Sequence, residues 1–517
     1  MTIHLTVRPG FYADSVFLMT IARELRQLDG VTDAALVMGT EANKALLPPS
    51  GSLDQAVLAA QASDLIIMID AGEDMLATAL ETMDRLLVAR PTAKHDALSP
   101  PPRSLRSAVR THPDANLALI SVPGQYAAAE AWQALHMGRH VFLFSDNVSV
   151  QDERALKAYA LENGLFVMGP GAGTAIINGV GVGFANAVPR GHIGIVSASG
   201  TGLQEVSTLL AKQGSGISQA IGVGGRDLSD EVGGIMTRQA IDWLQADPET
   251  AVIIAISKLP SPSVTSQIMA QLAANNKPAV VIFMSPTLPD AIGDVRVAST
   301  LHEAAMLAHV LATGGDVAQA QHHHQQKIAA VAERAAQIRS QLSPQRIYLR
   351  GLFSGGTLCE EAMRIWSQSV GPVWSNGPLE PAYQLQDSHR SCAHSAVDLG
   401  DEEFTIGRPH PMIDNELRMQ RLRTEMADPT VAAIQMDIVI GYGAHPDPAA
   451  ELAPVIALAA QQMPVVLSIT GTDADIQQFD HQKAQFEAAG ALVLESNALA
   501  SHFMACLTGG ARDNIRQ

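Results

Sequence analysis

Short apolar runs rich in Val and Ile alternate with longer Ala- and Leu-rich amphipathic runs along most of the 517 residues. Such alternation is typical of parallel sheets whose strands are joined by crossover helices. A single core does not grow to this length, so three or four domains are expected. The sequence therefore predicts a multidomain α/β protein with parallel sheets. The expected strands are residues 3–7, 35–38, 64–69, 117–122, 140–144, 165–168, 193–197, 251–257, 279–283, 348–353, 431–440, 465–469 and 491–494.

The charge and cysteine content exclude several functional classes. The net charge is −18 and no Lys/Arg cluster of useful size occurs, so a nucleic-acid partner is not expected. Cys359, Cys392 and Cys506 are odd in number and show no CxxC spacing, which predicts no disulfide framework and no metal site. No signal-peptide pattern or apolar run of membrane-spanning length is found, so a cytoplasmic location is expected.

Two stretches have the composition of connecting segments. Residues 91–104 are rich in Pro and predict an exposed loop. Residues 314–344 predict a polar, Ala/Gln-rich helix that contains His322, His323 and His324. Adjacent histidines on a helix point in different directions, whereas ligands on one face need a spacing of four. A solvated linker helix is therefore favoured over a metal site.

An internal repeat indicates a duplicated domain. Residues 192–205 (HIGIVSASGTGLQE) and 347–361 (IYLRGLFSGGTLCEE) each have an apolar strand, a small-residue turn ending in Gly-Thr, and a Glu four residues after the Thr. Residues 246–256 and 427–437 match next, each with an Asp-Pro turn followed by a buried strand. Two landmarks in the same order favour two domains of one fold, fused in one chain.

The two Gly-Thr turns are candidate anion sites. Each lies between a strand and a helix, where free N–H groups and the helix dipole favour a phosphate or carboxylate. A plain helix cap is the alternative interpretation. Neither turn matches the Walker or the dinucleotide fingerprint pattern. The candidate anion-binding residues are Ser199, Gly200, Thr201, Gly355, Gly356 and Thr357.

Further glycine-rich and histidine-containing loops follow other strands. Residues 169–178 and 222–227 have the flexibility to line a nucleotide-like ligand, although ordinary strand-to-loop transitions look the same. Residues 400–414 contain Arg408 and His410 beside three acids, which suits a proton carrier, a nucleophile or a His fixed in a rigid turn. The candidate ligand-lining residues are Gly169, Pro170, Asn178, Gly224, Gly225 and Arg226, and the candidate catalytic residues are Arg408 and His410.

These motifs carry a resemblance to known proteins. Residues 194–201 resemble the α subunit of succinyl-CoA synthetase, and residues 350–447 resemble the carboxyl-terminal domain of its β subunit. The order of the pieces resembles the FdrA family of acyl-CoA-synthetase-like proteins. That resemblance implies a Rossmann-like CoA-binding-type domain over residues 1–190, two flavodoxin-like domains over 191–315 and 346–517, and a helical linker over 316–345.

The resemblance also implies a site at which two helix N-termini face one phosphohistidine. It puts Ser199, Gly200 and Thr201 at one helix start and residues 400–414 at the other. The sequence departs from the ligases, because residues 284–298, expected to supply the histidine, contain none. Residues 8–14 replace the N-terminal CoA loop, and no ATP-grasp domain is recognised.

Three functions are compatible with these observations. The first, implied by the FdrA resemblance, is a subunit that transfers an acyl or carbamoyl group between a small carboxamide, such as an oxamate or ureide derivative, and phosphate. The second is an acyl-CoA synthetase that borrows a nucleotide-binding subunit, and the third is a non-catalytic CoA- or nucleotide-binding scaffold. CoA, phosphate or carbamoyl phosphate are the expected ligands. Separately encoded partner subunits and a homo- or hetero-oligomer are also expected.

Overall fold

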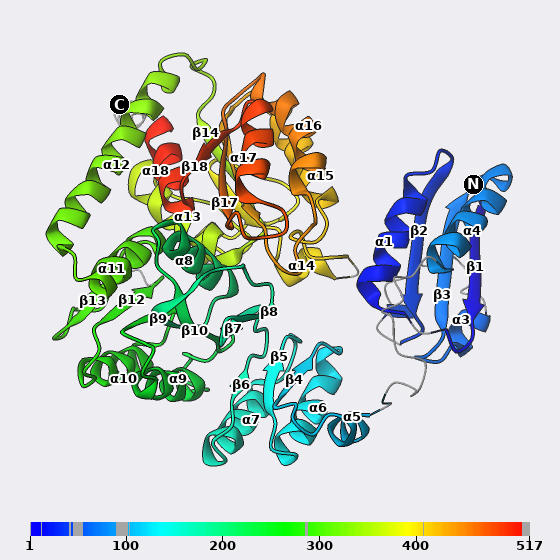
Figure 1. The fold of residues 1–517 in the computed structure, drawn as a ribbon. Helices are drawn as coiled ribbons and strands as arrows, with labels where there is room; N and C mark the ends of the chain where they lie inside the picture. The colour runs from blue at the N-terminus through cyan, green and yellow to red at the C-terminus, as the bar shows by residue number, and fades with distance from the viewer. Residues whose placement is uncertain are drawn as a thin grey trace. The chain divides into compact units, whose positions relative to one another are not determined.

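A computed structural model describes residues 2–11, 13–40, 43–44, 55–88, 102, 104–284, 288–406 and 408–508 (Figure 1). Most of the expected loop at 91–104 lies outside the described residues. The chain divides into two compact units. One contains residues 1–101 with 402–410, and the other contains residues 102–401 with 411–517. Each unit is described by itself.

The N-terminal unit contains a three-stranded sheet of order β1-β3-β2, and both outer strands run antiparallel to β3. The strand–helix alternation predicts parallel pairing, and for this sheet the prediction is wrong. The reason is a split β-α-β unit: β1 and β2 are parallel, but β3 lies between them and takes all their hydrogen bonds. Leu18 and Leu25 of α1 and Met83 of α4 pack on this sheet. The elements are β1 (Thr2–Arg8), α1 (Ser15–Arg26), β2 (Val31–Met38), α3 (Gln55–Ala59), β3 (Leu65–Ala71), α4 (Glu73–Val88) and, from the distant segment, α14 (Glu402–Thr405).

The second unit begins with a small parallel sheet of order β4-β5-β6. Its strands are short and almost fully apolar, because helices cover them. The expected domain at 1–190 therefore contains this sheet as well as the separate N-terminal sheet. The elements are α5 (Leu105–Thr111), β4 (Leu117–Ile120), α6 (Gly124–His136), β5 (His140–Leu143), α7 (Val150–Glu162) and β6 (Val167–Met168).

The next sheet has the order β13-β12-β11-β9-β10-β7-β8. Strands β9 to β13 are parallel, and their order is the 2-1-3-4-5 order of flavodoxin-like folds. The hairpin β7–β8 extends the sheet and was not predicted. The elements are β7 (Thr174–Ile177), β8 (Val180–Gly183), β9 (Arg190–Ser197), α8 (Gly200–Lys212), β10 (Ile217–Gly222), α9 (Ile235–Ala246), β11 (Val252–Ser257), α10 (Pro262–Ala273), β12 (Ala279–Phe283), β13 (Val295–Val297) and α11 (Leu301–Thr313).

The last sheet repeats this topology, with the parallel order β15-β14-β16-β17-β18. This confirms the prediction of two flavodoxin-like domains. The elements are β14 (Tyr348–Phe353), α13 (Gly356–Val370), η1 (Pro381–Tyr383), β15 (Ser395–Asp398), α15 (Glu416–Met426), β16 (Val431–Val439), α16 (Pro448–Ala460), β17 (Val465–Thr470), α17 (Phe479–Ala488), β18 (Leu492–Leu494) and α18 (Asn497–Thr508).

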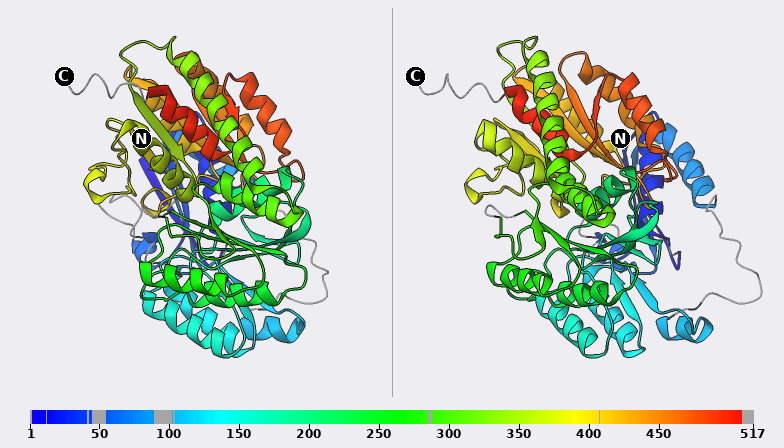
Figure 2. Two further views of the ribbon diagram at one scale, coloured as in Figure 1. Left: turned by 90° about the vertical axis from the view of Figure 1, so that its left-hand side faces the viewer. Right: turned by 60° about the vertical axis from the view of Figure 1, so that its left-hand side comes forward.

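The helix α12 (Val317–Arg339) joins the two flavodoxin-like domains and packs along α18 and α11 (Figure 2). The prediction that its histidines are solvated is wrong for His324, which is 5% exposed. The His324 ring stacks on His302 of α11 with 4.8 Å between centroids. Burial lowers the pKa of His324 and lowers that of His302 to about 4. The helix is therefore part of the domain interface.

Candidate functional site

The two Gly-Thr turns of the repeat lie against each other. The Oγ of Ser199 and the Oγ1 of Thr357 are 2.6 Å apart. A Cβ added to Gly355 would lie 2.7 Å from the Cγ2 of Thr201, so glycine is needed for this approach. Each turn follows the first parallel strand of its sheet, β9 or β14, at the switch point where open α/β sheets bind ligands. The start of α13 thus faces the start of α8, and the expectation that the facing helix start lies in residues 400–414 is not supported.

The local sequence leaves hydrogen-bond donors unused at this junction. Ser199 is extended (φ −140°) and caps α8 by accepting from the backbone N–H of Gly202 at 2.8 Å. Among the described residues, five backbone N–H groups at the two helix starts have no acceptor. Such groups carry the positive end of the helix dipole and favour an anion. These N–H groups belong to Gly200, Thr201, Gly356, Thr357 and Leu358.

A small pocket opens beside the start of α8, with about 180 Å³ of empty space including solvent at its mouth. Its walls are small residues, so its polar surface comes mainly from the backbone. Gly224 has φ +87°, and a Cβ there would lie 2.5 Å from the carbonyl oxygen of Pro170. The loops around Gly169–Pro170 and Gly224 therefore meet beside this pocket, and their role in lining a ligand stays a prediction. The lining residues are Gly171, Ala172, Gly173, Thr174, Ser197, Ala198, Ser199, Gly200, Gly222 and Gly224.

An acidic side chain, Asp398, and a basic side chain, Lys258, lie close to the start of α13. A Cβ added to Gly356 would lie 2.4 Å from Oδ2 of Asp398 and 2.7 Å from Nζ of Lys258. Burial raises the pKa of the Asp398 carboxyl to about 6, although the Lys258 charge and the N–H of Gly400 oppose the rise. Neither residue is predicted from the sequence. The available signal was a charged residue at the carboxyl end of a buried strand, β11 for Lys258 and β15 for Asp398.

Asp437 holds the turn that precedes α13. Its carboxylate accepts from the backbone N–H groups of Ser354 (2.7 Å) and Gly355 (2.9 Å) and from the Ser354 hydroxyl (3.0 Å). Arg418, also buried, pairs with it at 3.3 Å. Burial raises the pKa of Asp437, while Arg418 and the three donors oppose this. The turn is thus fixed by a buried ion pair from outside the site.

A second buried network fixes the loop of Gly224. Lys157 is fully buried and contacts Glu153 at 2.7 Å, Asp227 at 2.8 Å and the Val223 carbonyl at 3.0 Å. Asp227 also accepts from the N–H and hydroxyl groups of Thr237 at the start of α9. Arg226, predicted to line a ligand, forms an ion pair with Glu153 at 2.9 Å.

The remaining predicted residues lie elsewhere. Asn178 occupies the β7–β8 turn with φ +51° and exchanges hydrogen bonds with Gln219. Arg408 and His410 belong to the N-terminal unit, and their catalytic roles stay predictions.

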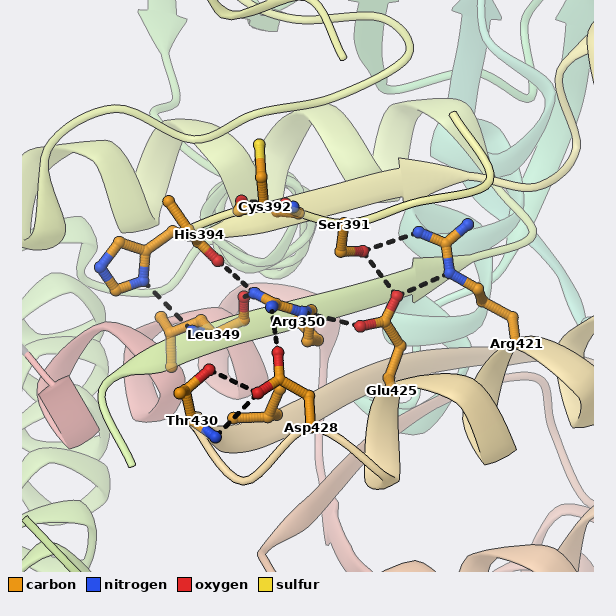
Figure 3. A network of polar contacts seen from close by, with 12 residues as sticks. Leu349, Arg350, Ser391, Cys392, His394, Arg421, Glu425, Asp428 and Thr430 are labelled. Carbon is orange, nitrogen blue, oxygen red and sulfur yellow. Dashed lines mark hydrogen bonds and ion pairs between the residues drawn. The ribbon is translucent and has the colours of Figure 1, made fainter. Parts of the chain in front are cut away.

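A further buried network lies at the opposite end of β14 from the Gly-Thr turn (Figure 3). Arg350 contacts Glu425 at 2.8 Å and Asp428 at 3.2 Å, and Arg421 contacts Glu425 at 2.6 Å. Ser391 donates to Glu425 at 2.5 Å. The network joins α15 to the segment before β15, which makes it part of the scaffold that carries the site.

Comparisons with known proteins agree with this architecture. The family described as "CoA-ligase" matches residues 352–507, "CoA binding domain" matches 190–285, and "AllF, heavy metal-associated domain" matches 1–101. The α subunit of ADP-forming succinate–CoA ligase from Aquifex aeolicus is 36% identical over 151 residues, 28% of this chain and 48% of that subunit. The SauD subunit of ADP-forming sulfoacetate-CoA ligase from Bilophila wadsworthia is 28% identical over 165 residues, which cover 30% of this chain and 54% of that subunit.

The fold and these matches define a succinyl-CoA-synthetase-like CoA-binding and ligase scaffold. The protein YahF of Escherichia coli is 41% identical over 508 residues, which cover 96% of this chain and 97% of YahF. The chain belongs to the FdrA-like family of acyl-CoA-synthetase-like proteins that includes YahF.

The name of the N-terminal match raises the question of a metal. Residues 1–101 contain no cysteine, the ligand that soft heavy metals prefer. Across the described ranges, no group of three or more His, Cys, Asp or Glu side chains is arranged to hold a metal ion. The residues present do not fit a heavy metal. Among the described helices, none is long and apolar enough to cross a membrane.

Proposed function

We propose that the chain is a subunit of an enzyme that transfers an acyl or carbamoyl group between a small carboxamide and phosphate. The observation that carries this proposal is the meeting of the α8 and α13 starts at Ser199 and Thr357. The unpaired N–H groups there suit the phosphate of an acyl phosphate or carbamoyl phosphate. The pocket beside α8 is lined by Ser199 and Gly200, so it opens at the same helix start.

Asp398 and Lys258, which lie beside Gly356, supply the reactive groups of this site. Asp398 removes a proton from the attacking N–H or O–H group, because its raised pKa of about 6 makes it a stronger base and its Oδ2 lies beside Gly356. The Gly400 N–H holds its other oxygen in place. Lys258 adds a positive charge that stabilises the negative charge developing on the substrate. The bond from the carbonyl carbon to the phosphate oxygen breaks as the new bond forms. The N–H groups of α8 receive the leaving phosphate.

Phosphate-dependent carbamoyl transfer tests the proposal, measured with co-encoded partner proteins in the presence and absence of this chain. Transfer should require the chain and should fall strongly in Ser199→Ala, which removes both the α8 cap and the contact with Thr357. Ser149→Ala is the matched control, because Ser149 caps α7 in the same way, at 3.0 Å from the Asp152 N–H. Full transfer by the partners alone would reject the proposal.

An acyl-CoA synthetase that works with a separate nucleotide-binding subunit is the second candidate. The matches to CoA-ligase families and to α subunits of two CoA ligases favour it. It requires a phosphorylated residue, and residues 284–298 contain no histidine. Incubation with labelled ATP or a labelled acyl phosphate, followed by peptide mapping, tests it. A chain in which His410 and the other histidines stay unlabelled counts against this candidate.

A further inference from the structure

Glu205 and Glu361 occupy equivalent places in the two flavodoxin-like domains, four residues after Thr201 and Thr357. Each side chain crosses to the other domain and caps a helix there. Glu205 accepts from the Asn497 N–H at the start of α18, at 3.0 Å. Glu361 accepts from the Leu301 N–H at the start of α11, at 2.7 Å. The exchange is reciprocal, so the two carboxylates hold the domains in one relative position.

Both carboxylates are buried, at 2% exposure for Glu205 and 1% for Glu361. Their other contacts are neutral: Glu205 accepts from the Thr470 hydroxyl at 2.5 Å, and Glu361 accepts from the Asn497 side-chain amide at 2.8 Å. In the described part of the chain, neither forms an ion pair with a basic group within 4.0 Å. The basic groups that act on the two acids are Lys212, whose charge interacts with Glu205, and Arg364, whose charge interacts with Glu361.

The groups that face Glu361 determine its ionisation. Its pKa is raised to about 7: burial and the nearby charge of Glu205 raise it, against the hydrogen bonds from Leu301 and Asn497 and the charge of Arg364. Each glutamate also lies one helical turn from the junction, because four residues rise about 6 Å along a helix. A negative charge on Glu361 therefore lowers the affinity for an anion at the N-terminus of its own helix, because like charges repel.

We propose that Glu205 and Glu361 are positioning residues, which hold the first turns of α8 and α13 together and, through ionisation of Glu361, set how tightly an anion binds there. The inference rests on the anion site of the proposed function. When Glu361 is protonated, the N–H groups at the junction bind the anion without repulsion from a nearby carboxylate. When Glu361 ionises, the anion is bound more weakly, although the fold is unchanged.

Sulfate binding by isothermal titration calorimetry tests this, because the charge of sulfate is constant over the pH range used. The wild-type affinity should fall about five-fold from pH 6 to pH 8, the size expected for one charge at this distance in a partly solvated site. Glu361→Gln should remove the fall around pH 7. Asp398→Asn should keep it, because Asp398 titrates at lower pH.

A second variant keeps the test decisive if Glu361→Gln folds poorly. Glu205→Gln removes the charge that raises the Glu361 pKa, so it should move the fall in affinity to lower pH. A merely structural role would change thermal stability and leave the pH dependence of sulfate binding where it was. Wild-type binding without a fall near pH 7, or an unchanged profile in either glutamine variant, overturns the inference. Absence of sulfate binding at every pH instead rejects the anion site.

Discussion

Gly355→Ala tests whether the starts of α8 and α13 touch as described. The backbone of Gly355 (φ −116°, ψ 112°) is one that alanine adopts freely, so any cost must come from the added methyl group. That methyl would lie 2.7 Å from Cγ2, 3.0 Å from Cβ and 3.0 Å from Oγ1 of Thr201. All three distances are below normal contact. Overpacking of this kind costs about 1–3 kcal/mol, so we expect that loss in the free energy of unfolding.

A double-mutant cycle with Thr201→Gly makes the test specific. The Thr201→Gly change removes the three atoms that the new methyl would strike, so Gly355→Ala should cost little in that background. Gly377→Ala is the control, because nothing lies within 4 Å of its added Cβ. Unfolding in urea gives the free energy of unfolding of each variant, and sulfate titration measures whether the anion site still binds. If Gly355→Ala is as stable as Gly377→Ala, or Thr201→Gly gives no rescue, the two turns do not meet as described.

Three further predictions follow from buried or shifted groups. Lys157→Met should destabilise the protein by about 3–5 kcal/mol in urea unfolding, since it leaves Asp227 buried without its cation and Glu153 with Arg226 alone; a loss below 1 kcal/mol contradicts the network. The pKa of Glu361 is raised from 4.5 to about 7, so about 3 kcal/mol of stability, fully present below pH 4.5, is lost as pH rises to 7. Glu361→Gln should flatten that part of the stability–pH curve, and an unchanged curve argues against it. Asp398→Asn should slow transfer and remove a rise in rate near pH 6, because the base must be ionised to act; a variant with the wild-type pH profile excludes Asp398 as the base.

Local features of the sequence predict the parts of the site that are themselves local. The cap at Ser199, the Gly-Thr turns and the glycine loops at Gly169 and Gly224 each follow from a strand, a turn and a helix that are adjacent in the chain. Strand–helix alternation predicts the parallel sheets of both domains, and the resemblance to succinyl-CoA synthetase implies their flavodoxin-like topology.

Features that depend on packing between distant segments could not be predicted. Lys258 and Asp398 come from different domains, and only the contact between those domains brings them over Gly356. The partner of the Ser199 turn was expected in residues 400–414, because the resemblance gives an order of segments and no contacts. His324 looks solvated in a polar helix, yet its position against His302 depends on how α12 packs on α11.

The helix α12 has a consequence for how the site is assembled. Its 23 residues span about 35 Å, and it packs against α11 in one domain and α18 in the other. The helix α12 is therefore a semi-rigid link between the two domains. Because they belong to one chain, each domain meets the other at an effective concentration of the order of millimolar or higher. Proteins that build a comparable junction from two separate chains lose it on dilution. Here the junction of α8 and α13 should persist at any protein concentration, and its formation becomes a step of folding.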